Sequence, residues 1–457
     1  MYRIFDIPPI FCKSNTFSNQ REVWLRYKFL MMVGYVGGYL VLLYGYYVYL
    51  APVWGYYGFL WRPNWGKVVE ALIWVVIISW SLPISFCRPS EFYLHFQVLV
   101  PVLPMLVIYG AMGQPRTYIY AVIFSFYVMF LVVKLSRCVV KSIQFKPICA
   151  PKIKRKELQL LLLLIGYLVV VSIFLQGGMR YFNLSLDKVY VYRSAASSNL
   201  PIFYGYINSW TSKVIFPFAF LLAFITKEKV RAFLSIIGSI LMFGLTSHKD
   251  VLFYPFAVIL FYWIAGIGRR KSIAFFLVGY YFVVIFSLID YWWGIFHGWM
   301  ATLTLRRVIF VPALLNFYYY DFFSRHSFVY WAQSKITLRM VSYKYSLDVP
   351  HLIGLHYFGS STIGANTGWL GSGYANAGIM GMVIYAALIG SIFSLLDAIA
   401  KFHDKRVIVA IFVAPMFAMI ISSDLPAALL THGTLIGLLL LMFFQTRELH
   451  NGRKTSV

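Results

Sequence analysis

The chain has 457 residues, of which 61% are hydrophobic and only 12% are charged, and its net charge at pH 7 is +25. So apolar a chain cannot cover itself with a water-compatible surface, which excludes a soluble protein. Apolar runs of about 20 residues recur along the whole length, which also excludes a soluble domain with one anchor. We therefore predict a single integral membrane domain, residues 1–457, built from α-helices.

Hydropathy predicts about twelve membrane-spanning helices. In the first half of the chain they cover 29–50, 68–87, 93–112, 117–135, 157–176 and 203–226. In the second half they cover 232–247, 251–268, 272–290, 371–397, 407–421 and 427–445. The apolar segment 308–323 is too short to span and contains Pro312 and Asn316, so it is predicted to form a re-entrant or interfacial helix.

Basic residues set the predicted orientation, because loops rich in Lys and Arg stay in the cytoplasm. With both ends of the chain in the cytoplasm, most of the 40 Lys and Arg residues lie inside, and 134–156 is the main cytoplasmic basic loop. The large outer loops are then 177–202 and 291–370. This bias accounts for most of the net charge, so we expect no nucleic acid partner.

Basic residues on the outer side oppose this bias and are therefore candidates for a functional role. We predict that these cations, with one adjacent histidine, bind the substrate: Arg180, Arg193, Lys213, His248, Lys249, Arg306 and Arg307. For Lys213, which lies at membrane depth, a snorkelling side chain is an equally good interpretation.

Arg306 and Arg307 are adjacent, so on a helix their side chains diverge by about 100° and contact different atoms. The two planar guanidinium groups suit the two phosphates of a diphosphate. The alternative is that one of them pairs with a structural carboxylate or a lipid headgroup. By contrast, Asp321 and Arg325 are four residues apart, which on a helix favours a structural ion pair.

The outer histidines His326 and His356 are candidate general bases, because imidazole reaches both protonation states near neutral pH. For either one alone, a structural histidine is the better interpretation. No Asp-x-Asp pair and no helical His pair at four-residue spacing occurs, so we predict no metal and no other cofactor. In the glycine-rich stretch 364–378, Asn366 and Trp369 are predicted to meet a sugar by hydrogen bonds and stacking.

Four segments together resemble one family: Tyr192-Arg193, the run 246–250, Arg306-Arg307 with Pro312-Ala313 behind it, and 366–378. They are similar to the Wzy-type O-antigen polymerases, which polymerise bacterial oligosaccharide repeat units. The resemblance extends over nearly the full chain. It implies a metal-independent glycosyltransferase with a GT-C-like, all-α polytopic fold.

The resemblance also implies a reaction and a place. Such an enzyme transfers the growing glycan from undecaprenyl diphosphate to the terminal sugar of a lipid-linked repeat unit, at the periplasmic face of the bacterial inner membrane. By position, the resemblance implies that Arg193, Lys249, Arg306 and Arg307 contact the diphosphate and the rest of the substrate. The implied partners are the undecaprenyl-diphosphate-linked oligosaccharide, the lipid bilayer and a chain-length co-polymerase.

Two other functions stay open on the sequence. An O-antigen ligase shares the number of spans, the large outer loop and a basic site, and differs in its acceptor. A non-enzymatic lipid-linked oligosaccharide flippase or other transporter also fits twelve spans, although its cations should lie inside a central cavity.

Overall fold

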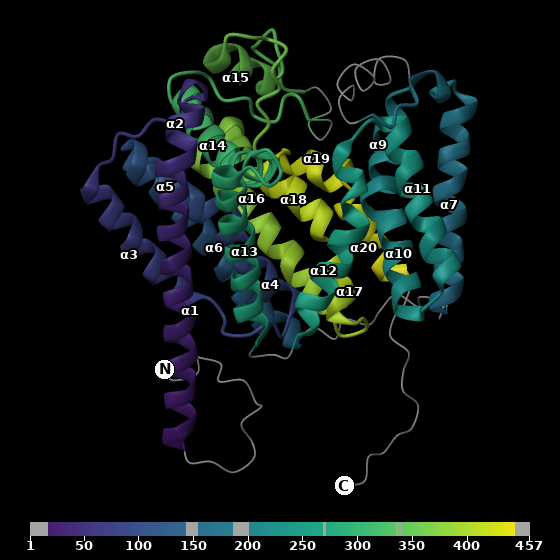
Figure 1. The fold of residues 1–457 in the computed structure, drawn as a ribbon, viewed down its shortest axis with the longest axis horizontal. Helices are drawn as coiled ribbons and strands as arrows, with labels where there is room; N and C mark the ends of the chain where they lie inside the picture. Colours follow the sequence, from purple (N-terminus) through teal and green to yellow (C-terminus); the bar gives the residue numbers. More distant parts are fainter. Residues whose placement is uncertain are drawn as a thin grey trace.

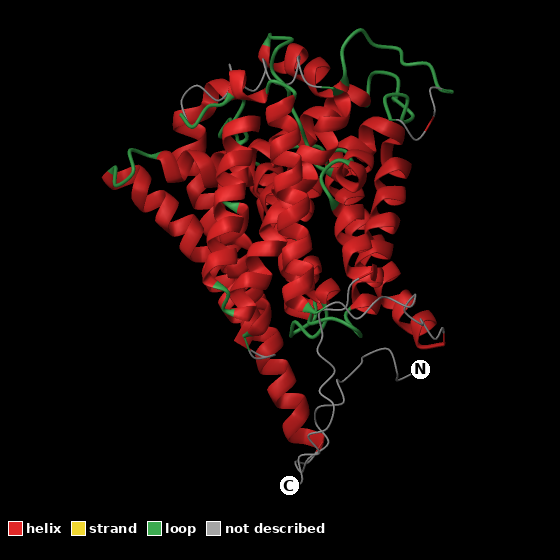
Figure 2. Ribbon diagram, turned by 90° about the vertical axis from the view of Figure 1, so that its right-hand side faces the viewer, coloured by secondary structure: helices red, strands yellow, loops and turns green. Residues whose placement is uncertain are grey.

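Helices form all the regular structure of the residues that the structure describes. These are 17–142, 154–185, 201–267, 271–334, 337 and 340–443 of a computed structural model (Figure 1). No strand occurs within them, as the secondary-structure colouring of Figure 2 also shows. The predicted all-α fold class is confirmed.

The helices of the first half are α1 (Phe17–Gly45), η2 (Tyr46–Leu50), α2 (Ala51–Trp54), η3 (Gly55–Tyr57), α3 (Trp65–Ser81), α4 (Pro89–Gln97), η4 (Val98–Val102), α5 (Leu103–Met112), α6 (Arg116–Ser142), α7 (Arg155–Leu175), η5 (Gly178–Tyr181), α9 (Ile202–Trp210), η6 (Thr211–Ile215) and α10 (Phe216–Thr226). Those of the second half are α11 (Lys229–Thr246), η7 (Lys249–Leu252), α12 (Tyr254–Gly266), α13 (Lys271–Trp293), η8 (Ala301–Phe310), α14 (Val311–Phe323), α15 (Val349–Phe358), α16 (Trp369–Ile399), α17 (Lys405–Ile411), α18 (Val413–Ile421), α19 (Leu425–Leu430) and α20 (Thr434–Phe443).

Eight of these helices, some with their π-helical or 3₁₀ continuations, are long and apolar enough to cross a membrane: Arg21–Tyr57, Pro89–Met112, Arg116–Cys138, Arg155–Leu175, Phe203–Thr226, Lys229–Thr246, Lys271–Trp293 and Trp369–Ile399. Each coincides with one of the twelve predicted spans. The protein is therefore a multi-pass membrane protein.

The other four predicted spans form shorter or interrupted helices. The 68–87 prediction corresponds to α3, which ends at Ser81, and the 251–268 prediction to α12, which begins at Tyr254. The 407–421 prediction is divided between α17 and α18, and the 427–445 prediction between α19 and α20. In the last case Gly433, with φ of +91°, separates the two helices. Twelve spans therefore stay a prediction.

Helix α16 lies at the centre of the bundle and packs against α6, α14 and α4. Gly390 permits the close approach to α6, since a Cβ there would lie 2.8 Å from the carbonyl oxygen of Met129. The helix is kinked at Ala377 and Gly378, whose backbones are not helical. The kink leaves the carbonyl oxygens of residues 375 and 376 able to accept hydrogen bonds from a loop, as shown below.

Helix α14 occupies the segment for which a re-entrant or interfacial helix is predicted. Its residues from Pro312 to Phe317 are all buried, and it packs against α16. Pro312 does not break it, because proline is tolerated in the first turn of a helix. Of the two predicted placements, a helix lying on the lipid surface does not fit this burial.

One end of the bundle carries α2, α14, α15 and α19, and we call it the loop end (Figure 1). The start of α1 lies at the opposite end. Four π-helical segments, η2, η4, η6 and η8, interrupt helices in the described part of the chain. Such segments are uncommon and occur frequently at functional sites. Two of them contain predicted site residues, because Lys213 lies in η6 and Arg306 and Arg307 lie in η8.

Candidate functional site

Arg306 stacks on aromatic rings at the loop end. Its guanidinium carbon lies 3.6 Å from the ring centroid of Trp54 and 5.8 Å from that of Tyr57. The turn before η8 is organised by Asp290, whose carboxylate accepts hydrogen bonds from the backbone amides of Phe296 and Met300 at 2.5 and 2.8 Å. Arg306 follows this turn in η8 and makes a cation–π contact with Trp54.

Two N–H groups of the stacked Arg306 and Trp54 side chains have no hydrogen-bond acceptor among the described residues. Arg306 Nε and Trp54 Nε1 are both buried and have no hydrogen-bond partner. Among the ion pairs between described residues, none includes Arg306. Partial burial and the charge of neighbouring Arg307 lower the pKa of Arg306, but arginine stays protonated at any physiological pH. A buried donor without an acceptor costs about 1–3 kcal/mol, so this geometry favours an anionic ligand with several acceptor oxygens.

A continuous series of rings leads away from Arg306 along α14 and α15, and we call it the aromatic row. Its members are Trp54, Tyr57, Phe358, Tyr318, Tyr357, His356, Phe322 and His326. Successive rings are close: Tyr57 and Phe358 have centroids 4.5 Å apart, and Tyr318 and Tyr357 are stacked at 4.1 Å. Phe322 is buried, so only the row's more exposed rings can offer a face or an edge to a sugar.

The two predicted bases lie at the far end of the row. His326 stacks on Phe322 at 4.1 Å, and its ring centroid is 6.3 Å from that of His356. Both side chains are exposed. His326 Nδ1 lies 2.8 Å from the carbonyl oxygen of Phe322, so this nitrogen is assigned as the donor and Nε2 as the acceptor.

The ion pair predicted from four-residue spacing is present. Arg325 Nη2 lies 2.7 Å from Asp321 Oδ1, and the hydroxyl of Tyr357 donates to Asp321 Oδ2 at 2.6 Å. Asp321, through Tyr357, thus connects α14 with α15, whereas the Arg325 side chain is exposed.

The structure brings the two histidines together but keeps them far from Arg306. Arg306 and His326 lie near the two ends of the nearly continuous helix formed by η8 and α14. At about 1.5 Å per residue, the helical part alone separates them by on the order of 20 Å. A base and a leaving diphosphate that act on the same anomeric carbon must lie within a few Å of it. In this structure, therefore, the two candidate bases lie far from the predicted diphosphate contact at Arg306.

Lys213 and His248 belong to a second group, which includes residues that the sequence did not single out. Lys213 Nζ hydrogen-bonds His432 Nδ1, and His248 Nδ1 lies 4.0 Å from Asp250 Oδ1. The hydroxyl of Tyr254 donates to Asp250 Oδ2 at 2.5 Å. We call these five residues the Lys213 group.

Charges within the Lys213 group compensate one another. Partial burial raises the pKa of Asp250, but the positive charge of Lys213 and the hydrogen bond from Tyr254 outweigh it and hold that pKa below its usual value. The carboxylate is therefore stabilised in its charged form.

The other predicted residues are dispersed. Arg180 is exposed on η5 beside α7 and α11, on the opposite side of the loop end from α14 and α15 (Figure 1). Lys249 begins η7. Arg193 lies outside the described residues.

Trp369 does not fit the predicted sugar contact. It is only 1% exposed, and its indole Nε1 donates to Gln97 Oε1 at 3.1 Å. Helix α16 packs against α4, which carries Gln97, and against α18, so this ring belongs to the core. Asn366, three residues earlier, is exposed and lies at a cavity.

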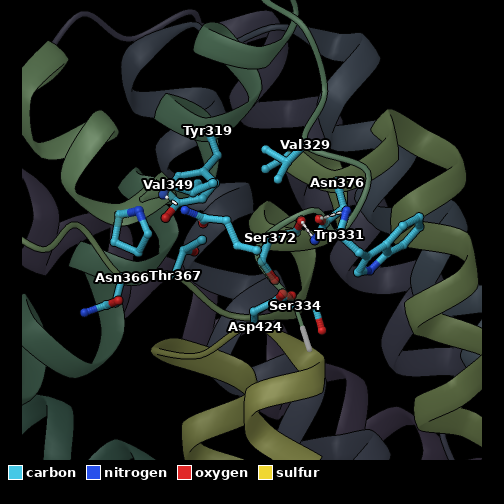
Figure 3. Close-up of a pocket in the computed structure, with 13 residues that line it drawn as sticks. Tyr319, Val329, Trp331, Ser334, Val349, Asn366, Thr367, Ser372, Asn376 and Asp424 are labelled. Atoms are coloured by element: carbon cyan, nitrogen blue, oxygen red, sulfur yellow. Dashed lines mark hydrogen bonds between the residues drawn. The ribbon is translucent and has the colours of Figure 1, made fainter. Parts of the chain in front are cut away.

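This cavity, of about 90 Å³, lies between α14, the first residues of α15, α16 and the start of α19 (Figure 3). Its lining includes Asp424, which the sequence analysis missed. The signal was weak: Asp424-Leu425-Pro426 is the ordinary pattern of a helix N-cap followed by proline in the first turn.

Fold and site together define an all-α, multi-pass membrane protein. Its loop end carries an arginine without an ion-pair partner among the described residues, an aromatic row and a polar cavity. Comparison with known proteins finds no family model, no curated protein and no solved structure that matches the chain.

Proposed function

We propose that the protein polymerises O-antigen or a similar surface polysaccharide at the periplasmic face of the bacterial inner membrane. A hydroxyl of the terminal sugar of one lipid-linked repeat unit attacks the anomeric carbon of the growing glycan. The new glycosidic bond forms, the bond to undecaprenyl diphosphate breaks with its electron pair, and a base takes the hydroxyl proton. Arg306 and Arg307 bind the diphosphate of a lipid-linked oligosaccharide.

The observation that carries the proposal is the unsatisfied pair of donors at Arg306 and Trp54. A diphosphate supplies both the negative charge and the acceptor oxygens that these groups lack. Exposed Arg307, next in the same π-helical segment, adds a second cation. The aromatic row then begins where the sugars attached to that diphosphate start.

The distribution of charge supports the orientation. Helices α7, α13 and α17 begin with Arg155, Lys271 and Lys405, at the end of the bundle opposite the loop end (Figure 1). The positive-inside rule then assigns the loop end to the periplasm. In the proposed GT-C-like plan, the four shorter helical segments complete twelve spans, with both chain ends in the cytoplasm.

The test replaces Arg306 in cells that lack the native gene and scores glycan length on gels. Loss of a charged hydrogen bond costs about 1.5–3 kcal/mol, so Arg306→Ala should reduce long chains by roughly 10- to 100-fold. Arg325→Ala is the matched control, because Arg325 lies at the same end but is exposed and paired with Asp321. Its chains should keep the wild-type length.

The same experiment separates the alternatives. Loss of polymer with single repeat units still on the surface supports a polymerase. Loss of all surface glycan in the gene-deleted cells indicates a ligase, and repeat units trapped on the cytoplasmic face indicate a flippase. Wild-type chain lengths from Arg306→Ala contradict the proposed diphosphate site.

A further inference from the structure

The cavity at the loop end is built by a loop that docks on the kink of α16. The amides of Val329 and Tyr330 donate to the carbonyl oxygens of Ala375 and Asn376, each at 2.9 Å, and the amide of Trp331 donates to Asn376 Oδ1 at 2.9 Å. Tyr330 and Trp331 both have φ in the left-handed region, at +50° and +58°. Non-glycine residues rarely adopt this conformation, which is found at ligand sites more often than elsewhere.

Asp424 forms part of the cavity wall and is held in a fixed orientation. Its Oδ1 accepts hydrogen bonds from the Tyr385 hydroxyl at 2.7 Å and from the Leu425 amide at 2.9 Å. The same Tyr385 hydroxyl accepts from Trp331 Nε1 at 2.7 Å and from Asn376 Nδ2 at 3.1 Å. The carboxylate is thus oriented by side chains that themselves have partners.

Thr367 also lines the cavity, and its hydroxyl has no hydrogen-bond partner among the described residues. Thr367 is only 3% exposed, and its hydroxyl oxygen is buried without a hydrogen bond. Figure 3 shows Thr367 and Asn366 on one side of the cavity and Asp424 below them. The volume of about 90 Å³ is several times the 10–15 Å³ that one water needs. These groups suit a ligand with hydroxyls, such as the edge of a sugar ring.

Burial raises the pKa of Asp424 above the usual value of a carboxyl, although hydrogen bonds from Tyr385 and Ser372 act in the opposite direction. A raised pKa makes a carboxylate a stronger proton acceptor. The exposed histidines of the aromatic row lack such an enclosed site.

Tyr319 lies on the helical stretch that runs from the cavity to Arg306 and its rings Trp54 and Tyr57, which we call the Arg306 site. It lines the cavity and follows Arg306 by thirteen residues along η8 and α14, which corresponds to on the order of 20 Å. The first residues of α15, Val349 and Pro350, also line the cavity, whereas the last turn belongs to the aromatic row. A lipid-linked repeat unit whose diphosphate is bound at Arg306 can therefore place its distal sugar at the cavity.

Resting on the proposed polymerase function, we propose that the cavity receives the terminal sugar of the acceptor and that Asp424 is the catalytic base. A carboxylate oxygen of Asp424 takes the proton of the attacking hydroxyl as that oxygen bonds the anomeric carbon of the donor. The donor's bond to undecaprenyl diphosphate breaks, and the diphosphate leaves with the electron pair. Arg306 then holds the acceptor lipid, which does not react at its diphosphate.

The test uses the full-length protein purified in detergent, with lipid-linked repeat units extracted from cells that lack it. Asp424→Asn keeps the shape and the Oδ1 acceptor while removing the base, so it should stay folded and lose 10²- to 10⁴-fold in kcat. Asp348→Asn is the control, because Asp348 is an exposed carboxylate at the same end. It should keep wild-type activity.

A pH profile separates a base from a structural carboxylate. Wild-type kcat should fall as the pH drops through the raised pKa of Asp424. Tyr385→Phe removes a hydrogen bond that lowers this pKa, so it should move the acid limb to higher pH. Arg306→Ala should raise KM for the repeat unit while leaving the acid limb in place.

The outcomes are separable. If purified wild-type protein forms no polymer and gene-deleted cells accumulate no repeat units, the proposed function fails. If the wild type polymerises and folded Asp424→Asn keeps its kcat, or if His356→Gln removes the acid limb instead, the assignment of Asp424 is overturned while the function stands.

Discussion

Arg306 and Lys213 were both predicted as site residues because each is a basic residue expected on the outer side of a membrane protein. The structure gives them different partners. Arg306 and Lys213 themselves both lie in π-helical segments. Lys213 has His432 as a hydrogen-bond partner and the charge of Asp250 nearby. Arg306 has two aromatic rings and, among the described residues, no carboxylate partner. A cation whose partners are all within the protein stabilises the fold, whereas one that still lacks an acceptor is available to a ligand.

This difference in partners also indicates a structural role for the Lys213 group. Lys213 lies in η6, Asp250 in η7 and His432 just before α20, so their contacts connect three segments that are far apart in sequence. The Arg306 contacts connect η8 only to the end of the first helix. Loss of Lys213 should therefore affect stability, and loss of Arg306 should affect function.

The largest effect expected from this comparison is that of Lys213→Met. The variant leaves His432 without its hydrogen bond and Asp250 without a nearby positive charge, so the free energy of unfolding should fall by about 1–3 kcal/mol. Thermal unfolding in detergent measures the loss, with Arg306→Ala as the reference that keeps the wild-type Tm. Equal Tm values for the two variants would remove the distinction between the sites.

A smaller effect is expected from Trp54→Leu, which removes the ring under the Arg306 guanidinium. A cation–π contact contributes about 1 kcal/mol, so the apparent affinity for lipid-linked repeat units should fall roughly 5-fold. Trp65→Leu is the matched control, because Trp65 is 64% exposed at the start of α3. A similar loss from both variants would show that the stacking is not specific.

The smallest effect concerns the pH dependence of stability. Because the pKa of Asp250 in the folded protein lies below its usual 3.8, the folded state binds this proton more weakly than the unfolded state. The stabilisation is present above about pH 4 and is lost as the pH falls through the lowered pKa. The carboxylate is 46% exposed, so screening limits the contribution to below about 1 kcal/mol.

Comparison of Tm at pH 5 and pH 3 checks this sign. Asp250→Asn and Lys213→Met should each lose less stability between the two values than the wild type does. A larger acid loss in Lys213→Met would contradict the pairing of Lys213 with Asp250.

Particular residues show how far sequence reasoning reached. The Asp321–Arg325 ion pair was predictable because its partners are only four residues apart, at the end of α14 and in the turn that follows it. Trp369 was misassigned because a tryptophan in a glycine-rich stretch can face a sugar or the core, and only packing against Gln97 decides. Asp424 was missed because its partner Tyr385 lies 39 residues away on another helix.

By itself, the sequence determined the membrane class and the helical fold, and it selected the candidate basic residues, because hydropathy and charge bias act along the chain over short ranges. Only the tertiary structure decided which cations have partners, that Arg306 and the histidines lie at opposite ends of η8 and α14, and that a partly buried carboxylate borders a cavity. These properties depend on contacts between helices that are distant in sequence. No local sequence pattern predicts the geometry of such contacts.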